Sequence, residues 1–95
     1  MTPLFEITDQ AWETMLSHAS SRCDIELGGV LLGTGDASGV HIKAALPALS
    51  ARGASSHVTF TADTWVDIHR TIEERFASMT IVGWYHTHPG FGVFL

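Results

Sequence analysis

The chain has 95 residues, of which 45% are hydrophobic and 16% charged, and its formal net charge is -5. This length and composition fit a single globular domain over residues 1–95. The acidic balance argues against a nucleic-acid surface, which needs clustered Lys and Arg. No apolar run approaches the roughly 20 residues of a membrane span, and the first residues lack the basic start of a signal peptide. We therefore expect a cytoplasmic protein that binds neither nucleic acid nor membrane.

The N-terminal segment is predicted to form a short strand and a helix. Residues 4–7 favour the strand, and Thr8 or Asp9 can cap a helix that runs to about Arg22. Apolar residues at helical spacing form one face of this helix, namely Trp12, Met15, Leu16 and Ala19. We expect His18, on the same helix, to be a surface residue.

A hairpin and a loop are predicted next. Residues 30–32 form an apolar run between glycines, which indicates a buried strand followed by a turn. Residues 40–49 then form the return strand, interrupted at Pro47 because proline cannot donate a ladder hydrogen bond. The small and polar stretch 50–56 predicts a loop, and residues 57–61 alternate enough to form a strand.

A second helix and a further strand complete the predicted elements. Thr61 or Asp63 can cap the helix, whose apolar stripe consists of Trp65, Ile68, Ile72 and Phe76. The strand covers residues 80–86 and is apolar on both faces. Alternation places Val82 and Trp84 on one face, and their neighbours Ile81 and Tyr85 on the other. This pattern is typical of a central strand that is covered on both sides.

Two histidines at the end of this strand are candidate metal ligands. His86 and His88 are two residues apart, so on a strand they point to the same side. Their rings can then converge on one metal, with Zn–N bonds of roughly 2.0–2.1 Å. Pro89 ends the strand, and Gly90 and Gly92 predict a loop that can pass close to a metal or substrate. The alternative is a pair of strand-end histidines that bond to the backbone.

A catalytic zinc takes three protein ligands and a water, so the two histidines need a further group. Glu26 stands out because it precedes an apolar strand, where a carboxylate is costly unless it has a partner. Beside a metal-bound water, this carboxylate can act as a general base. The alternative for Glu26 is a solvent-exposed residue at the start of a strand. The other candidates are Asp24, His57, Asp63 and His69.

Two segments together resemble the JAMM family of metalloproteases, also called MPN+ or JAB1/Mov34. They are residues 26–33, ELGGVLLG, and residues 83–92, GWYHTHPGFG. The family motif places a Glu in an E-x-x-G-x-x-x-G context ahead of H-x-H-P, and the predicted order of elements also matches. The resemblance covers essentially the whole chain. It implies an α/β domain with the MPN, cytidine-deaminase-like fold, in which helices flank a mixed central sheet.

The resemblance also implies a role for each motif residue. His86 and His88 would be zinc ligands, and Glu26 would be the general base that hydrogen-bonds the zinc-bound water. The family's oxyanion serine would be the first residue after Leu95, and its third zinc ligand, an aspartate, would lie three residues further on, so both are absent from this chain. We therefore expect a fragment without the C-terminal part of the domain. Its zinc site is expected to be empty or weakly occupied, the alternative being Glu26 as a direct ligand.

The implied activity is that of a prokaryotic zinc-dependent isopeptidase or peptidase, similar to deubiquitinases. In its full-length form it would cleave a ubiquitin-like or sulfur-carrier protein from conjugates. The alternative is a catalytically inactive MPN scaffold that acts through protein–protein contacts. For the 95-residue chain itself we expect little activity. Exposed apolar surface and open sheet edges predict that it self-associates as a homo-oligomer.

Overall fold

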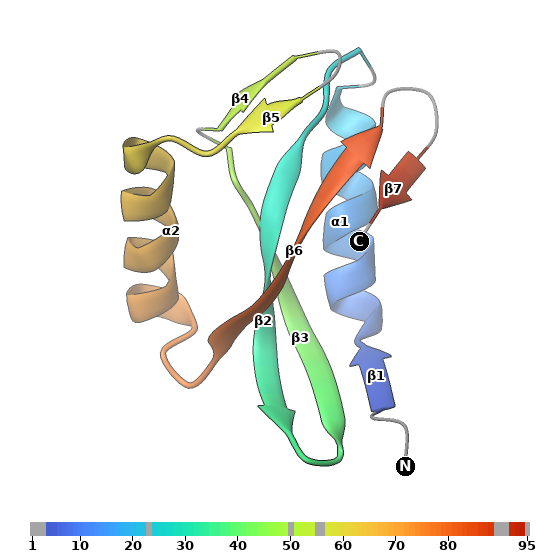
Figure 1. Cartoon of the computed structure of the whole chain (residues 1–95), viewed down its shortest axis with the longest axis vertical. Helices are drawn as coiled ribbons and strands as arrows, with labels where there is room; N and C mark the ends of the chain where they lie inside the picture. Colours follow the sequence, from blue (N-terminus) through green and yellow to red (C-terminus); the bar gives the residue numbers. More distant parts are fainter. Residues whose placement is uncertain (1–3, 23, 50, 55–56, 89–91, 95) are drawn as a thin grey trace.

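Figure 1 shows the computed structural model of the protein, in which two helices flank a curled mixed sheet. The structure describes residues 4–22, 24–49, 51–54, 57–88 and 92–94. The predictions for Pro89 and Gly90 fall outside the described residues. The expected α/β fold with a mixed central sheet is confirmed.

The main sheet contains five strands in the order β1-β3-β2-β6-β7. Their bounds are β1 Leu4–Ile7, β2 Gly28–Asp36, β3 Gly39–Pro47, β6 Thr80–His88 and β7 Gly92–Phe94. β1 runs parallel to β3, and the other neighbouring strands are antiparallel. Two short strands, β4 (Arg52–Gly53) and β5 (Val58–Thr59), form a separate hairpin that lies beside the start of β2 in Figure 1.

The two helices, α1 (Asp9–Ser21) and α2 (Ala62–Arg75), begin at caps that the sequence predicts. The Thr8 hydroxyl accepts a hydrogen bond from the Ala11 N–H, which satisfies one of the unpaired donors of the first turn. Thr61 caps α2 in the same way and exchanges hydrogen bonds with Thr64. Within the described residues, no helix is long and apolar enough to cross a membrane.

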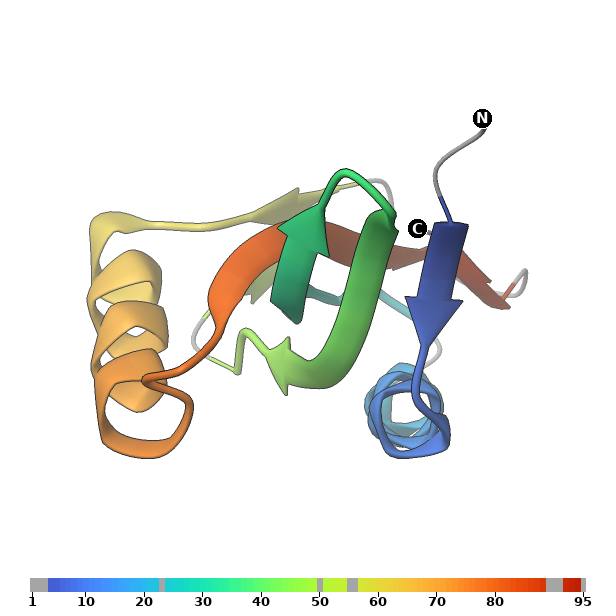
Figure 2. The same cartoon turned by 90° about the horizontal axis from the view of Figure 1, so that it is seen from below.

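Alternate residues of β2 contribute to two hydrophobic clusters, one toward each helix. Leu31 belongs to the cluster under α1, which consists of Ala11, Met15, Leu31, Ile42, Ala45 and Tyr85. Val30 and Leu32 belong to the cluster under α2, which consists of Val30, Leu32, Ala48 and Ile68. Figure 2 shows the consequence, with α1 and α2 lying on either side of β2 and β3. The central strand β2 therefore forms the common wall of both clusters.

The prediction for His18 is wrong. The buried residues of α1 are Ala11, Met15 and His18, whereas Trp12 and Leu16 of the expected apolar face are 41% and 42% exposed. His18 is tolerated inside because its Nδ1 lies 2.8 Å from a buried hydroxyl on β6. Helical periodicity alone could not predict the burial of His18, because its polar partner belongs to another element.

The expected alternation along β6 is wrong at Ile81 and Val82, because the strand contains a bulge at Val82. Its pairing with β2 shifts by one residue there. The extra residue puts Ile81 on the same face as Trp84, and Val82 on the face of Tyr85. Trp84 is 60% exposed, so β6 is not covered on both sides as predicted.

Two segments predicted as loops contain strands. Arg52–Gly53, inside the predicted loop 50–56, pairs with Val58–Thr59. Gly92 begins β7 and pairs with His88, so a hairpin partner extends the sheet beyond the histidine strand. Both strands are too short to show a period-2 pattern, and tertiary pairing alone defines them.

Candidate metal centre

The candidate metal centre lies where β2 begins and β6 ends, at the upper end of the sheet in Figure 1. Antiparallel pairing places Gly28 opposite His86. Glu26 lies two residues before Gly28, so it shares the sheet face of His86. Ligand atoms of Glu26, His86 and His88 all lie within 4.8 Å of one another. Sheet register therefore brings together residues that are far apart in the sequence.

The two imidazoles have the spacing of metal ligands. The Nε2 atoms of His86 and His88 are 3.2 Å apart. Two nitrogen ligands of one tetrahedral zinc are separated by roughly 3.3 Å when each bond is about 2.05 Å. His86 is half-buried and His88 is exposed, so the pair opens toward solvent. Two imidazole nitrogens and a carboxylate oxygen are donors that zinc accepts, and the residues present thus fit such an ion.

Glu26 is 7% exposed, so the alternative of a solvated residue is wrong. Its backbone N–H donates a hydrogen bond to the Ala54 carbonyl at 2.6 Å. A Cβ atom on Gly53 would lie 2.3 Å from the Glu26 carbonyl oxygen, so only glycine allows this approach. The β4–β5 hairpin therefore packs directly against the backbone of the candidate base.

Thr87, between the two histidines, is a residue that the sequence analysis missed. It is 4% exposed and makes two hydrogen bonds with Leu27, the residue after Glu26. A β-branched residue with a hydroxyl between two candidate ligands was the available signal. Only the register of β2 against β6 shows its partner.

A second buried pair lies beneath the histidine strand. The Tyr85 hydroxyl and the Nδ1 atom of His18 are 2.8 Å apart, and their rings are perpendicular. Burial raises the pKa of Tyr85 and lowers the pKa of His18. Both side chains therefore stay neutral at pH 7, and we assign the tyrosine hydroxyl as the donor. The Tyr85 ring also packs on Gly29, where a Cβ atom would lie 2.4 Å from it.

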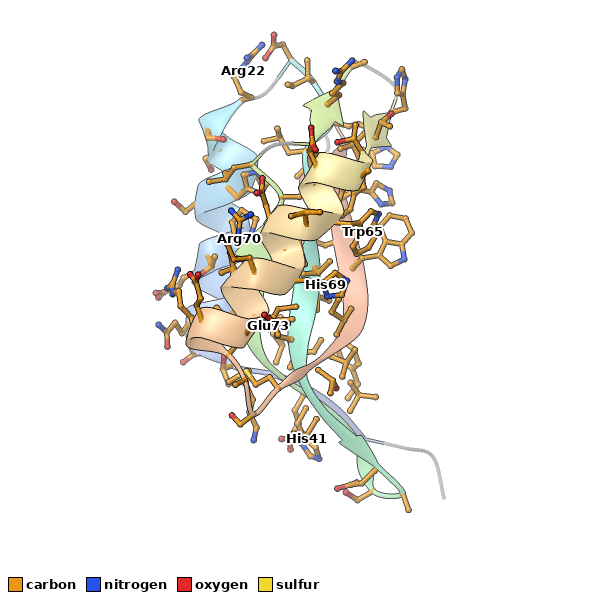
Figure 3. The ribbon with its side chains drawn as sticks, turned by 90° about the vertical axis from the view of Figure 1, so that its left-hand side faces the viewer. Arg22, His41, Trp65, His69, Arg70 and Glu73 are labelled. Atoms are coloured by element: carbon orange, nitrogen blue, oxygen red, sulfur yellow. The ribbon has the colours of Figure 1, made fainter. Side chains whose placement is uncertain are left out.

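An apolar groove adjoins the candidate metal centre. It has a volume of about 380 Å³ and is lined by Val30, Val58, Phe60, Trp65, Ile81, Val82, Gly83 and Trp84. The Trp84 ring lies 5.3 Å from the His86 ring, so the groove runs up to the candidate ligands. Trp65, expected on the buried stripe of α2, is 40% exposed and forms one wall. Figure 3 shows Trp65 and His69 on the side of α2 that faces β6.

Comparison with known proteins places the chain in a family. Residues 4–95 match the model of the JAB family, described as JAB1/Mov34/MPN/PAD-1 ubiquitin protease. The chain belongs to the JAB family. The predicted resemblance is thereby confirmed, and it extends over nearly all of the sequence.

Curated relatives carry two kinds of name. The chain is 34% identical over 94 residues to the NAD(+) hydrolase TcpA of a Theionarchaea archaeon, covering 99% of this chain and 27% of the relative. It is 33% identical to COP9 signalosome complex subunit 5 of Kluyveromyces lactis, covering 94% and 24%, respectively. Subunit 5a of Arabidopsis thaliana is 31% identical, with 85% and 23% covered. The JAB domain thus spans about a quarter of the length of these relatives.

A solved structure supports the fold. The solution structure of protein DSY2949 from Desulfitobacterium hafniense matches with a TM-score of 0.64 and 21% sequence identity. The match covers 90% of this chain and 57% of that chain. At this identity the likeness concerns the arrangement of helices and strands.

The other candidate ligands do not join the group at the candidate metal centre. Among the residues that the structure describes, Glu26, His86 and His88 form the one group of three potential metal ligands. Asp24 instead accepts two hydrogen bonds from the exposed Arg22 side chain, which lowers the pKa of Asp24 to about 2. The remaining three candidates are all exposed, namely His57, Asp63 and His69.

Proposed function

We propose that this JAB domain holds the base and two zinc ligands of a peptidase that hydrolyses peptide or isopeptide bonds. The observation that carries the proposal is the approach of the Glu26 carboxylate to two imidazoles whose Nε2 atoms are 3.2 Å apart. The family description, which names a ubiquitin protease, supports the same reaction class. His86 and His88 are proposed as the ligands, and Glu26 as the general base.

The chemistry follows from the donor set. Zinc bound by the two histidines would polarise a carbonyl and lower the pKa of water. Glu26 is buried, its backbone is held by a hydrogen bond, and its carboxylate lies within 4.8 Å of the two ring nitrogens. It accepts the proton of the attacking water and delivers it to the leaving amine. His86 is half-buried and His88 is exposed, so the scissile bond can approach the two histidines from the solvent side.

The apolar groove supports a substrate class. Its walls are aromatic and aliphatic, and Trp84 extends it to the ring of His86. An extended apolar segment bound there would bring its C-terminal carbonyl toward the histidines. We therefore propose that the acyl part of the substrate is the C-terminal tail of a ubiquitin-like or sulfur-carrier protein. Trp84→Ala is expected to raise KM by about tenfold while kcat changes little.

Hydrolysis of such a conjugate by the full-length form of the protein is the direct test. Wild-type protein should release the ubiquitin-like protein, and a chelator should abolish release until zinc is restored. Glu26→Gln keeps the shape of the side chain and removes the base, so turnover should fall by about 100-fold or more. Asp63→Asn changes an exposed carboxylate that is not part of the three-residue group, so it is the matched control and should leave turnover unchanged. Unchanged turnover in Glu26→Gln would overturn the proposal.

A second candidate is a binding module without activity. The relatives named as subunits of the COP9 signalosome favour it, because their names describe members of an assembly. The exposed Trp84 and Leu49, at 60% and 83%, offer apolar contact area for a protein partner. Binding of a ubiquitin-like protein with no turnover under zinc-loaded conditions would favour this candidate over the peptidase.

A further inference from the structure

We propose that Thr87 is a positioning residue whose hydroxyl fixes the Glu26 backbone relative to the two histidines. The inference rests on the proposed role of Glu26 as general base. Thr87 is buried in β6 between His86 and His88. Because side chains alternate along a strand, its hydroxyl lies on the face opposite the two imidazoles. Thr87 is therefore no candidate ligand, and it acts through another residue.

Both backbone polar groups of Leu27 bond to Thr87. The Leu27 N–H donates to Oγ1 of Thr87 at 2.8 Å, and the Thr87 N–H donates to the Leu27 carbonyl at 2.8 Å. The regular pairing of β2 with β6 begins one residue later, with Gly28 opposite His86. A side-chain oxygen thus replaces a backbone acceptor at the end of the ladder. Without it, a partly buried N–H would have no partner in this geometry.

These two bonds connect the base to both candidate ligands. Glu26 is one peptide unit from Leu27, and each histidine is one peptide unit from Thr87. On its other side, Glu26 donates its N–H to the β4–β5 hairpin. The Glu26 backbone is therefore held on one side by the hairpin and on the other side by β6. Only β6 also contains the two histidines. A catalytic group that moves by about 1 Å can lose on the order of 100-fold in rate.

Two substitutions separate the hydroxyl from the methyl group. Thr87→Val keeps the shape and removes the acceptor, whereas Thr87→Ser keeps the acceptor and removes the methyl. In metal-free protein, amide hydrogen exchange of Leu27 should be about tenfold faster in the Val variant and near wild type in the Ser variant. Thr34→Val, at the opposite end of β2, is the control and should leave Leu27 exchange unchanged.

Kinetics and metal binding, measured on the full-length form of the protein, complete the test. Thr87→Val should lower kcat by about tenfold or more, while KM and zinc affinity stay within about threefold of wild type. Thr87→Ser should restore kcat. Equal kcat losses in both variants, or unchanged Leu27 exchange in Thr87→Val, would overturn the positioning role.

Failure of the proposed function would give a different result, namely full turnover in Glu26→Gln. The exchange rate of the Leu27 amide in metal-free protein does not depend on whether the protein is a peptidase. Should Thr87→Val fail to fold, Thr87→Cys supplies a weaker acceptor. Leu27 exchange should then be faster than in Thr87→Ser, and equal exchange would contradict the proposal.

Discussion

Replacing Tyr85 by Phe removes one hydroxyl from the buried pair beneath the histidine strand and changes little else. Tyr85 is fully buried and His18 is 8% exposed, and their polar atoms are 2.8 Å apart. In the variant, Nδ1 of His18 remains buried with its partner gone. Leaving a buried polar group unsatisfied costs about 1–3 kcal/mol. We therefore expect Tyr85→Phe to lower the free energy of unfolding by about 2 kcal/mol.

Urea unfolding at pH 7.5 measures this loss. With an m-value of about 2 kcal/mol/M, the midpoint should fall by roughly 1 M while m stays constant. Thermal unfolding should show a drop of about 8–16 °C in Tm for a domain of this size. His69→Gln is the control, because His69 is exposed and should shift the midpoint by less than about 0.25 M. A midpoint for Tyr85→Phe that matches this control would refute the reasoning.

Three further predictions concern strain and charge. Gly53→Ala forces a Cβ against the carbonyl of the candidate base, so unfolding free energy should fall by about 1–3 kcal/mol, whereas Gly35→Ala, with open space around it, should be neutral in the same urea assay. Burial lowers the pKa of His18, so as the pH falls His18 becomes protonated in the unfolded chain before it does so in the folded protein. The free energy of unfolding is therefore fully present above about pH 6.5 and falls below that pH. His18→Gln should flatten this pH dependence in urea unfolding recorded across pH. Arg22→Gln should raise the pKa of Asp24 from about 2 toward its ordinary value in an NMR titration. An unchanged pH dependence of stability in His18→Gln would contradict the second prediction, and an unchanged Asp24 pKa would contradict the third.

Local signals in the sequence predicted the helix starts well. Thr8 and Thr61 act as caps through contacts within a few residues, so the sequence contains the whole cause. His18 failed for the opposite reason, because its partner Tyr85 is 67 residues away and belongs to another element. The bulge at Val82 is likewise set by pairing between strands, and it exchanged the expected faces of Ile81 and Val82.

In the candidate site, too, the features set by nearby residues were predictable and those set by distant residues were not. The spacing of His86 and His88 predicts two rings on one side of a strand, and their Nε2 atoms do approach to 3.2 Å. Glu26 stands out among the acidic and histidine candidates because it precedes an apolar strand, and the family resemblance supports the choice. Its burial could not be predicted, because it depends on the hairpin packed against it. The bonds between Thr87 and Leu27 could be found only from the sheet register, because the two residues are 60 positions apart in the sequence.

Zinc binding by the wild-type protein and three variants tests the central claim most directly. Calorimetric titration with zinc should show His86→Ala and His88→Ala binding weaker by about tenfold or more, because each removes one ligand. Glu26→Gln should bind within about threefold of wild type, because a general base that is no ligand leaves the donor set intact. Wild-type affinity in either histidine variant would contradict the account of the metal centre. A loss in Glu26→Gln as large as in the histidine variants would contradict the role of Glu26 as base.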